Sequence, residues 1–167
     1  MASQPSFDIS TGADLQEVDN AVNQARKEIS QRFDFKGTHC VIGFDRAKGA
    51  LDLEADDDYR MRALFEVLQG KLVKRGVPLK NVNAGDPEIA PGGKVRRTLT
   101  LTQGITSDTA KTIVKAVKDQ GFKKVQVAIQ GEELRVSSVS KDALQDVIRF
   151  LQGQDFGIEL KFGNYRS

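Results

Sequence analysis

Hydrophobic positions follow a helical period in four stretches of the chain. In the first, between about residue 14 and Phe33, they recur at three- and four-residue steps, at Leu15, Val18, Val22, Ala25 and Ile29. The other three stretches use Met61, Leu64, Phe65, Leu68 and Leu72, then Ala110, Ile113, Val114 and Val117, then Leu144, Val147, Ile148 and Leu151. Residue types that cap helix N-termini precede each stretch: Asp14, Asp56–Asp58, Thr106 or Ser107, and Ser140. The pattern therefore predicts four amphipathic helices.

Short apolar or alternating runs lie between these helices and predict strands. They fall at residues 6–10, 38–45, 51–55, 79–82, 94–102, 125–129, 134–136 and 158–162. In the run at 94–102, one face carries Val95, Arg97, Leu99 and Leu101.

The two halves of the chain repeat this order of elements. The region from Leu51 to Gly70 aligns without gaps on the region from Leu134 to Gly153, and both end in Leu-Gln-Gly. Each half has the order strand, helix, strand, strand, helix, strand. That order predicts an α+β protein, a tandem repeat of two ferredoxin-like βαββαβ units whose antiparallel sheets carry the helices on one face. Because proline and glycine gather between residues 76 and 93, we expect units at 1–85 and 86–167.

Composition and charge refine this picture only slightly. The chain has 39% hydrophobic and 29% charged residues, which is typical of an ordinary soluble protein. Residues 1–85 carry 12 Lys/Arg and 13 Asp/Glu, a net of −1, whereas residues 86–167 carry 13 and 10, a net of +3. A single cysteine, no visible secretory signal and no apolar run near the ~20 residues that cross a bilayer predict a cytoplasmic protein without membrane contact.

The motifs of the common enzyme classes are absent from the sequence. It contains no glycine-rich phosphate loop, no dinucleotide-binding fingerprint and no nucleophile elbow. His39 has no second histidine with which to share a metal ion, and Cys40 falls on the opposite face of the predicted strand. Helix capping explains the acidic run Asp56–Asp58 better than cation binding does. We therefore expect no enzyme, no metal site and no cofactor.

A first candidate binding segment follows the first predicted helix. Charges alternate there with two rings, in the order Arg32, Phe33, Asp34, Phe35 and Lys36. An extended backbone would put both rings on one side and the three charges on the other. The segment is either a structural joint anchored by its rings or a site where cations meet phosphate.

The sheet faces without helices are a second candidate. In the first unit this face would carry Asp52 and Glu54, which repel phosphate. In the second it would carry cations suited to phosphate, namely Lys94, Arg96, Lys124, Arg135 and Lys161. The central strands lack the aromatic residues on which RNA-recognition domains stack bases. A solvated polar face is therefore the alternative to a binding surface.

Several short motifs, in order along nearly the whole chain, resemble those of the YajQ family of bacterial proteins. They lie at residues 6–9, 32–37, 74–76, 103–105, 127–131 and 162–166. The resemblance implies two ferredoxin-like domains of the ribonucleoprotein type. One arrangement that it allows has the N-terminal strands exchanged between the two domains. Strand 6–10 would then join the second unit and strand 94–102 the first, giving units at 14–102 and at 1–13 plus 103–167. The resemblance further implies nucleotide binding without catalysis, with cyclic di-GMP or tRNA among the ligands of relatives.

Three hypotheses follow. The leading one is a non-enzymatic, nucleotide-binding effector of cyclic di-GMP that acts through a macromolecular partner such as a protein. Its candidate contacts are Arg32, Lys36 and Arg166 for phosphate, Asp34 and Asn164 for orienting a base or an arginine, and Phe35 or Tyr165 for stacking. The alternative is an RNA-binding (tRNA) adaptor that uses the basic sheet face of the second unit. The third hypothesis is a purely structural interaction module.

Overall fold

Four α-helices begin at the predicted caps. The computed structural model describes residues 4–167 and contains α1 (Leu15–Gln31), α2 (Asp58–Lys74), α3 (Ser107–Gln120) and α4 (Lys141–Gln152). Each follows a residue whose side-chain oxygen accepts a backbone N–H of the first turn, namely Asp14, Asp57, Thr106 and Ser140. The predicted helices and their N-terminal caps are confirmed.

The strands form two antiparallel sheets. One sheet contains β2 (Val41–Asp45), β3 (Ala50–Ala55), β4 (Val82–Ala84), β5 (Glu88–Ile89) and β6 (Val95–Leu101), in the order β2-β3-β6-β4 with β5 also paired to β6. The other contains β1 (Ser6–Ser10), β7 (Val125–Gln130), β8 (Glu133–Ser138) and β9 (Lys161–Arg166), in the order β7-β8-β1-β9.

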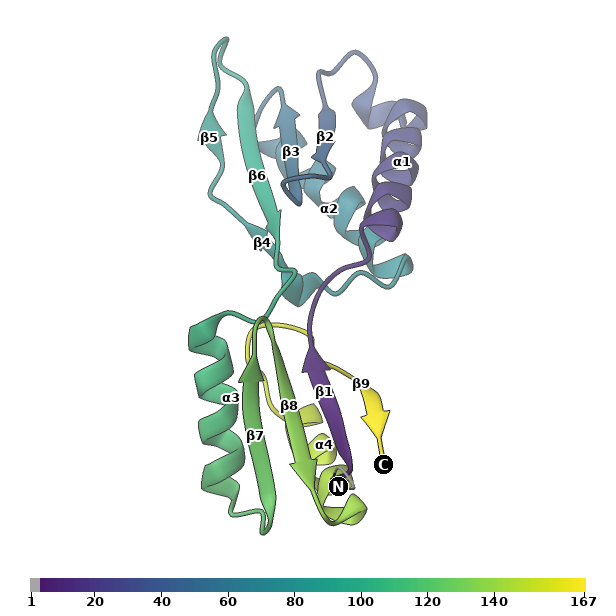
Figure 1. Ribbon diagram of the computed structural model, residues 1–167. Coiled ribbons are helices and arrows are strands. Elements are labelled where there is room, and N and C mark those ends of the chain that lie inside the picture. The colour runs from purple at the N-terminus through teal and green to yellow at the C-terminus, as the bar shows by residue number, and fades with distance from the viewer. Residues whose placement is uncertain (1–3) are drawn as a thin grey trace. The chain divides into compact units, whose positions relative to one another are not determined.

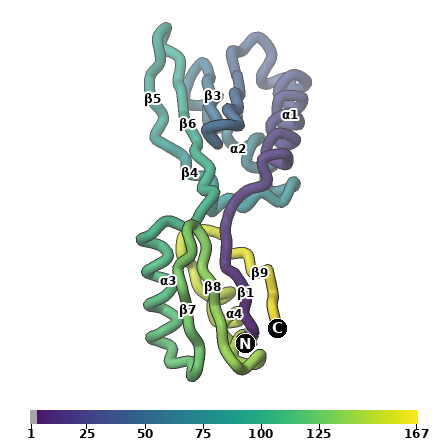
Figure 2. The backbone as a smooth tube through the Cα atoms, in the orientation of Figure 1, coloured from purple at the N-terminus to yellow at the C-terminus, as the bar shows by residue number. Residues whose placement is uncertain are grey.

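Two strands cross between the halves of the sequence. The N-terminal β1 lies between β8 and β9, and β6 lies between β3 and β4 (Figures 1 and 2). The chain accordingly divides into two compact units, of which the first, the α1–α2 unit, is Ala13–Thr102. The second, the α3–α4 unit, joins the residues up to Gly12 with Gln103–Ser167. The two N-terminal strands are thus exchanged between the units, which is one of the arrangements that the resemblance to the YajQ family allows.

Each unit has a hydrophobic core of its own between its sheet and its two helices. In the α1–α2 unit, Leu51 and Leu53 of β3 are fully buried. In the α3–α4 unit, Phe7 of β1 and Leu134 and Val136 of β8 are fully buried in the same way. Because the helices cover one face of each sheet (Figure 1), the opposite face is open, and the predicted ferredoxin-like organisation is confirmed.

The extended backbone considered for the first candidate segment is wrong. Phe33–Phe35 forms a short 3-10 helix, η1, directly after α1. Residues two apart in a helix of three residues per turn point in different directions. Phe35 is therefore 5% exposed whereas Phe33 is 86% exposed, so the two rings do not share a side.

Two strand boundaries also differ from the prediction. Leu79–Asn81 is a second short 3-10 helix, η2, which precedes β4. The last strand begins at Lys161 rather than near Ile158. Ile158 and Leu160 pack against the core of their unit from an irregular segment, so burial alone accounts for their apolar character.

Candidate functional site

The segment after α1 is anchored by one ring and exposes the other. Its turn is closed by backbone bonds from Phe35 N to Arg32 O (3.2 Å) and from Lys36 N to Phe33 O (3.1 Å). Phe35 belongs to the core of the α1–α2 unit, and the Arg32 guanidinium lies 5.1 Å from its ring centroid. The ring that faces solvent is that of Phe33, with Lys36 Nζ 6.0 Å from its centroid. Phe35 thus serves as a core anchor, and its side chain is almost fully buried.

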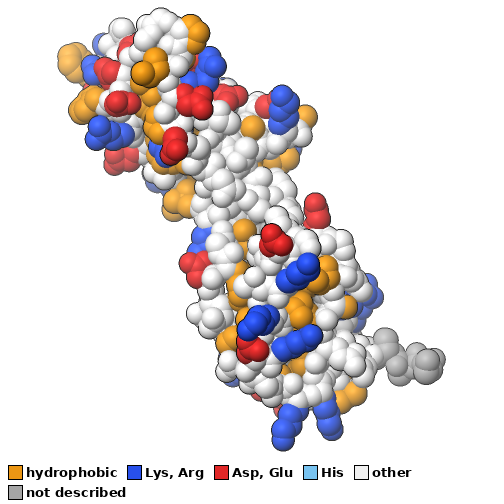
Figure 3. Space-filling model, turned by 90° about the vertical axis from the view of Figure 1, so that its left-hand side faces the viewer, with side chains coloured by type: hydrophobic (Ala, Val, Ile, Leu, Met, Phe, Trp, Pro, Cys, Tyr) orange, Lys and Arg blue, Asp and Glu red, His pale blue; other side chains and the backbone are white. Residues whose placement is uncertain are grey.

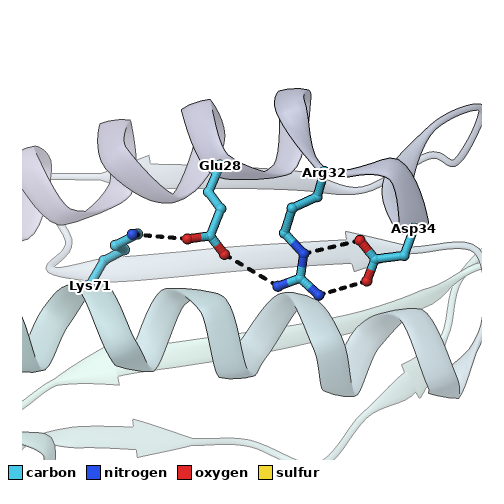
Figure 4. Close-up of polar contacts among 4 residues, drawn as sticks. All are labelled: Glu28, Arg32, Asp34 and Lys71. Carbon is cyan, nitrogen blue, oxygen red and sulfur yellow. Dashed lines mark hydrogen bonds and ion pairs between the residues drawn. The ribbon is translucent and has the colours of Figure 1, made fainter.

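Arg32 is held by carboxylates on both sides (Figure 4). Its Nε and Nη2 donate to the two carboxylate oxygens of Asp34 over 3.0 and 2.6 Å, and its Nη1 donates to Glu28 over 3.2 Å. Lys71 of α2 contacts the other oxygen of Glu28 at 3.0 Å. Lys71, and then Arg32, lower the pKa of Glu28, while Asp34, and then Glu28, raise the pKa of Arg32. A phosphate would have to displace a carboxylate from Arg32, so this group is an ion-pair chain rather than an open anion site.

The last strand, β9, contains a bulge. Ser6 of β1 lies opposite Arg166, but Asp8 lies opposite Gly163, so the register shifts between them. Asn164, inside the bulge, has φ of 52°, a left-handed conformation that asparagine tolerates better than most residues. Bulges at sheet edges redirect side chains, and this one sets the directions of the last residues of β9.

A carboxylate on the open face of the same sheet fixes the bulge. Asp8 accepts bonds from Arg135 Nε over 2.9 Å and from Asn164 Nδ2 over 2.5 Å. The hydrogen bond from Arg135 is the largest cause that lowers the pKa of Asp8, and Asn164 and the charge of Arg166 act in the same direction. The Asp8 side chain is only 13% exposed. It therefore ties β8, β1 and β9 together at the position of the bulge.

Beside the bulge, a hollow of about 300 Å³ lies between β1, β9 and α4. Its apolar lining includes Pro5, Phe7 and Leu144, and its polar lining includes Lys141, Gln145, Tyr165 and Arg166. The Tyr165 ring is 62% exposed and its centroid lies 6.2 Å from that of Phe7. No Asp or Glu is among the described residues that line this hollow. An exposed ring, an amide and two cations are groups that can recognise a base and phosphate oxygens.

The five cations predicted for one basic sheet face lie in two different units. Lys94 and Arg96 belong to the α1–α2 unit, and Arg96 contacts Glu54 of the neighbouring strand at 3.5 Å. Lys124, Arg135 and Lys161 belong to the α3–α4 unit, where Arg135 is paired with the carboxylate of β1. The candidate contacts for the nucleotide divide in the same way: Arg32, Asp34, Phe35 and Lys36 lie in the α1–α2 unit and Asn164, Tyr165 and Arg166 in the α3–α4 unit.

Sequence reasoning missed Lys141, Gln145 and Asp8. Lys141 and Gln145 lie one helical turn apart at the start of α4, where any polar residue is unremarkable in the sequence. Asp8 is 156 positions from Asn164, and only the pairing of β1 with β9 brings the two side chains together. No sequence pattern would have found these residues without the strand order.

The described residues hold no other obvious centre for chemistry. Within residues 4–167, no group of three or more His, Cys, Asp or Glu is placed to hold a metal ion. Burial is the largest influence on the Cys40 thiol and raises its pKa, which disfavours the nucleophilic thiolate. No helix of this part of the chain is both long and apolar enough to span a membrane.

The fold defines a tandem ferredoxin-like protein with exchanged strands, and its α3–α4 unit contains a hollow lined by apolar, aromatic and cationic side chains. The chain belongs to the YajQ family: the model of that family, described as "Nucleotide-binding protein YajQ-like", matches residues 5–166. A protein of Koribacter versatilis is 49% identical over 162 residues, which cover 97% of each chain. A protein of Streptomyces coelicolor is 47% identical over 161 residues, covering 96% of this chain and 98% of its own. Both relatives are bacterial, and both names describe nucleotide binding rather than catalysis.

Proposed function

We propose that this protein binds cyclic di-GMP and acts, without catalysis, through a macromolecular partner. The names of its relatives support nucleotide binding, and the resemblance to the YajQ family supports the particular ligand. The observation that carries the proposal is the hollow of the α3–α4 unit, whose lining includes Tyr165, Arg166 and Lys141.

The lining of the hollow matches the chemistry of a cyclic dinucleotide. Tyr165 offers an exposed ring to a guanine, and Gln145 offers an amide to its edge. Arg166 and Lys141 are separate cations on different elements, which suits two separate phosphodiester charges. Nucleoside triphosphates are usually held with Mg²⁺ and carboxylate ligands. Among the described residues, the lining contains no carboxylate, which favours a ligand with singly charged phosphodiesters.

Candidate residues outside the lining take different roles in this proposal. Asn164 supports the site from behind, because its amide fixes the bulge next to Tyr165. Arg32, Asp34 and Lys36 are less suited to direct contact, since Arg32 is already bound to two carboxylates.

Calorimetric titration of the nucleic-acid-free protein with cyclic di-GMP, GTP and bulk tRNA tests the proposal. We expect saturable binding of cyclic di-GMP that changes little with salt. Stacking on an aromatic side chain contributes about 1–3 kcal/mol, so Tyr165→Ala should weaken binding about tenfold or more. The matched control is Tyr59→Ala, because Tyr59 is similarly exposed (69%) but lies in the α1–α2 unit.

A second pair of variants tests the phosphate contact. Arg166→Ala should weaken binding, whereas Arg149→Ala should leave it unchanged, since Arg149 is exposed elsewhere on the same unit and bound to Asp146. If cyclic di-GMP does not bind, or binds equally well to the Tyr165 and Arg166 variants, the proposed site is wrong. Binding of tRNA alone, with a steep dependence on salt, would instead favour the RNA-binding alternative.

A further inference from the structure

The edge strands of the two sheets differ in how they are protected. Unpaired edge strands are normally blunted by charges, bulges or covering groups, because they can pair with another chain. On the β2 edge, Arg26 donates two bonds, of 3.1 and 2.7 Å, to the carbonyl of Ile42. The β9 edge carries the bulge and charged residues at both ends.

In the part of the chain that the structure describes, β7 itself contains neither a bulge nor a charge, although Lys123 and Lys124 directly precede it. Within residues 4–167, β7 pairs only with β8, so its other side is open. Its sequence, VQVAIQ, contains no charge and no proline, and Ile129 is 46% exposed. An uncharged edge strand of six residues is a template for adding another strand.

Lysines gather next to this edge. Residues 107–127, which include α3 and the start of β7, contain five lysines, Lys111, Lys115, Lys118, Lys123 and Lys124, against two aspartates, Asp108 and Asp119. Lys115 pairs with Asp119 at 2.7 Å. Figure 3 shows this side of the molecule, where Lys and Arg side chains surround hydrophobic ones over α3 and β7. The part of this surface formed by α3 and the start of β7 is thus complementary to negative charge, whereas Glu132 and Glu133 follow the other end of β7.

A hollow of about 360 Å³ lies beside Lys118 and the start of β7. It is lined by Val117, Lys118, Phe122, Val125, Gln126 and Val127. Val125 and Val127 point to one face of β7 and Gln126 to the other, so residues of both faces of this edge strand line the hollow. An apolar side chain could enter it next to a cation.

We propose that the β7 edge and the α3 lysines form a docking surface for an extended, acidic protein segment. The segment would add a strand to β7, place carboxylates against the lysines and insert an apolar side chain into the hollow. A protein segment fits better than RNA, because the open strand offers backbone hydrogen bonds. In addition, the Phe122 ring packs against Phe150, with centroids 5.8 Å apart, so it is less available for stacking with a base. This inference assigns the class of the macromolecular partner in the proposed function and rests on that part of it, not on the identity of the nucleotide.

The first test uses fluorescence anisotropy of the full-length protein with a labelled peptide in which valine and threonine alternate between pairs of glutamates. Two further peptides carry backbone N-methyl groups, one on the valines and one on the threonines. Only one edge of an added strand bonds to β7, so one methylated peptide should lose affinity at least tenfold and the other should bind like the parent. Equal binding of all three peptides, or no binding of the parent, would overturn the proposal.

The second test reverses charges on the protein. Lys111→Glu with Lys118→Glu should weaken binding of the parent peptide about tenfold, because two attractions to its glutamates become repulsions. Lys27→Glu with Lys48→Glu makes the same change of net charge in the α1–α2 unit and should have little effect. Equal weakening by both pairs would refute a local surface.

Labelled oligouridylate is measured alongside the peptide. If it binds more tightly than the peptide and loses affinity in the Lys111/Lys118 variant, the surface is for RNA and the proposal fails. Cyclic di-GMP is titrated into the same preparations by calorimetry. Nucleotide binding without peptide binding would then refute the docking surface alone and leave the nucleotide site standing.

Discussion

Replacing Asp8 by asparagine should destabilise the α3–α4 unit by about 1–2 kcal/mol. The variant keeps the shape of the side chain but removes the charge that Arg135 and Asn164 share. Hydrogen bonds to charged groups contribute about 1.5–3 kcal/mol each. Solvent screens part of this contribution, because the Arg135 side chain is 28% exposed. The amide oxygen of the variant can also still accept a hydrogen bond, which reduces the loss further.

The destabilisation caused by Asp8→Asn should become smaller at acidic pH. The folded-state pKa of Asp8 is lowered, chiefly by the hydrogen bond from Arg135. The stabilisation is therefore fully present above the unfolded-state pKa, about 3.9, and is lost as the pH falls through the lower folded-state pKa. The difference in unfolding free energy between wild type and Asp8→Asn should be constant from pH 7 to 5 and shrink below pH 4.

Urea unfolding followed by tyrosine fluorescence measures this difference. The protein has two tyrosines and no tryptophan, so in a Tyr59→Phe background Tyr165 reports on the α3–α4 unit alone. Asp52→Asn is the control, measured in a Tyr165→Phe background in which Tyr59 reports on the α1–α2 unit. Asp52 accepts a 3.0 Å bond from the neutral Thr98 hydroxyl on the open face of the other sheet. The reasoning is refuted if Asp8→Asn costs no more than the control at pH 7, or costs the same at every pH.

Three further substitutions separate local causes of stability. Asn164→Ala should destabilise by about 1 kcal/mol more than Asn164→Gly in urea unfolding, because only glycine adopts φ of 52° without strain; equal costs would contradict a role for this conformation. Phe35→Ala should cost about 3–5 kcal/mol and Phe33→Ala almost nothing, since the rings are 5% and 86% exposed; thermal midpoints of the two variants check this order. Arg32→Ala should cost less than about 1 kcal/mol by chemical denaturation, because its side chain is 42% exposed, and a larger loss would show that the ion-pair chain is a structural element.

The periodic parts of the sequence were enough to predict the elements and the repeat. Helical spacing and caps give all four helices, because amphipathic faces and N-caps are local properties. The alternation in β6 correctly assigns Val95 and Leu99 to the core and Arg96 to the open face. Alternation fixes the face of a strand, however, and carries no information about which sheet the strand joins.

That missing information explains why five cations were predicted for one sheet face although they lie in two units. Arg96 and Arg135 were expected on one surface because they lie in the same half of the chain, yet β6 completes the sheet of the other half. For the same reason, sequence reasoning found only some of the residues at the end of β9. Tyr165 and Arg166 were accessible to sequence reasoning, but Asp8 joins them only through a strand pairing that spans most of the chain.

Charge pairing between strands gives a physical reason for the exchange itself. In the repeat, Asp52 of β3 is equivalent to Arg135 of β8. Asp8 of β1 lies opposite Arg135, and Thr98 of β6 lies opposite Asp52 with Arg96 opposite Glu54.

Without the exchange, β1 would take the place of β6, and Asp8 would lie opposite Asp52 and next to Glu54. In turn, β6 would pair with β8, so that Arg96 would no longer contact Glu54 and would lie in the same sheet as Arg135. Like charges directly opposite each other in a sheet are destabilising, and opposite charges contribute roughly 0.2–1 kcal/mol per pair. The open faces of the two duplicated units therefore favour the strand from the other half, so the same charges that specify the exchange also position Asp8 behind the bulge at Tyr165.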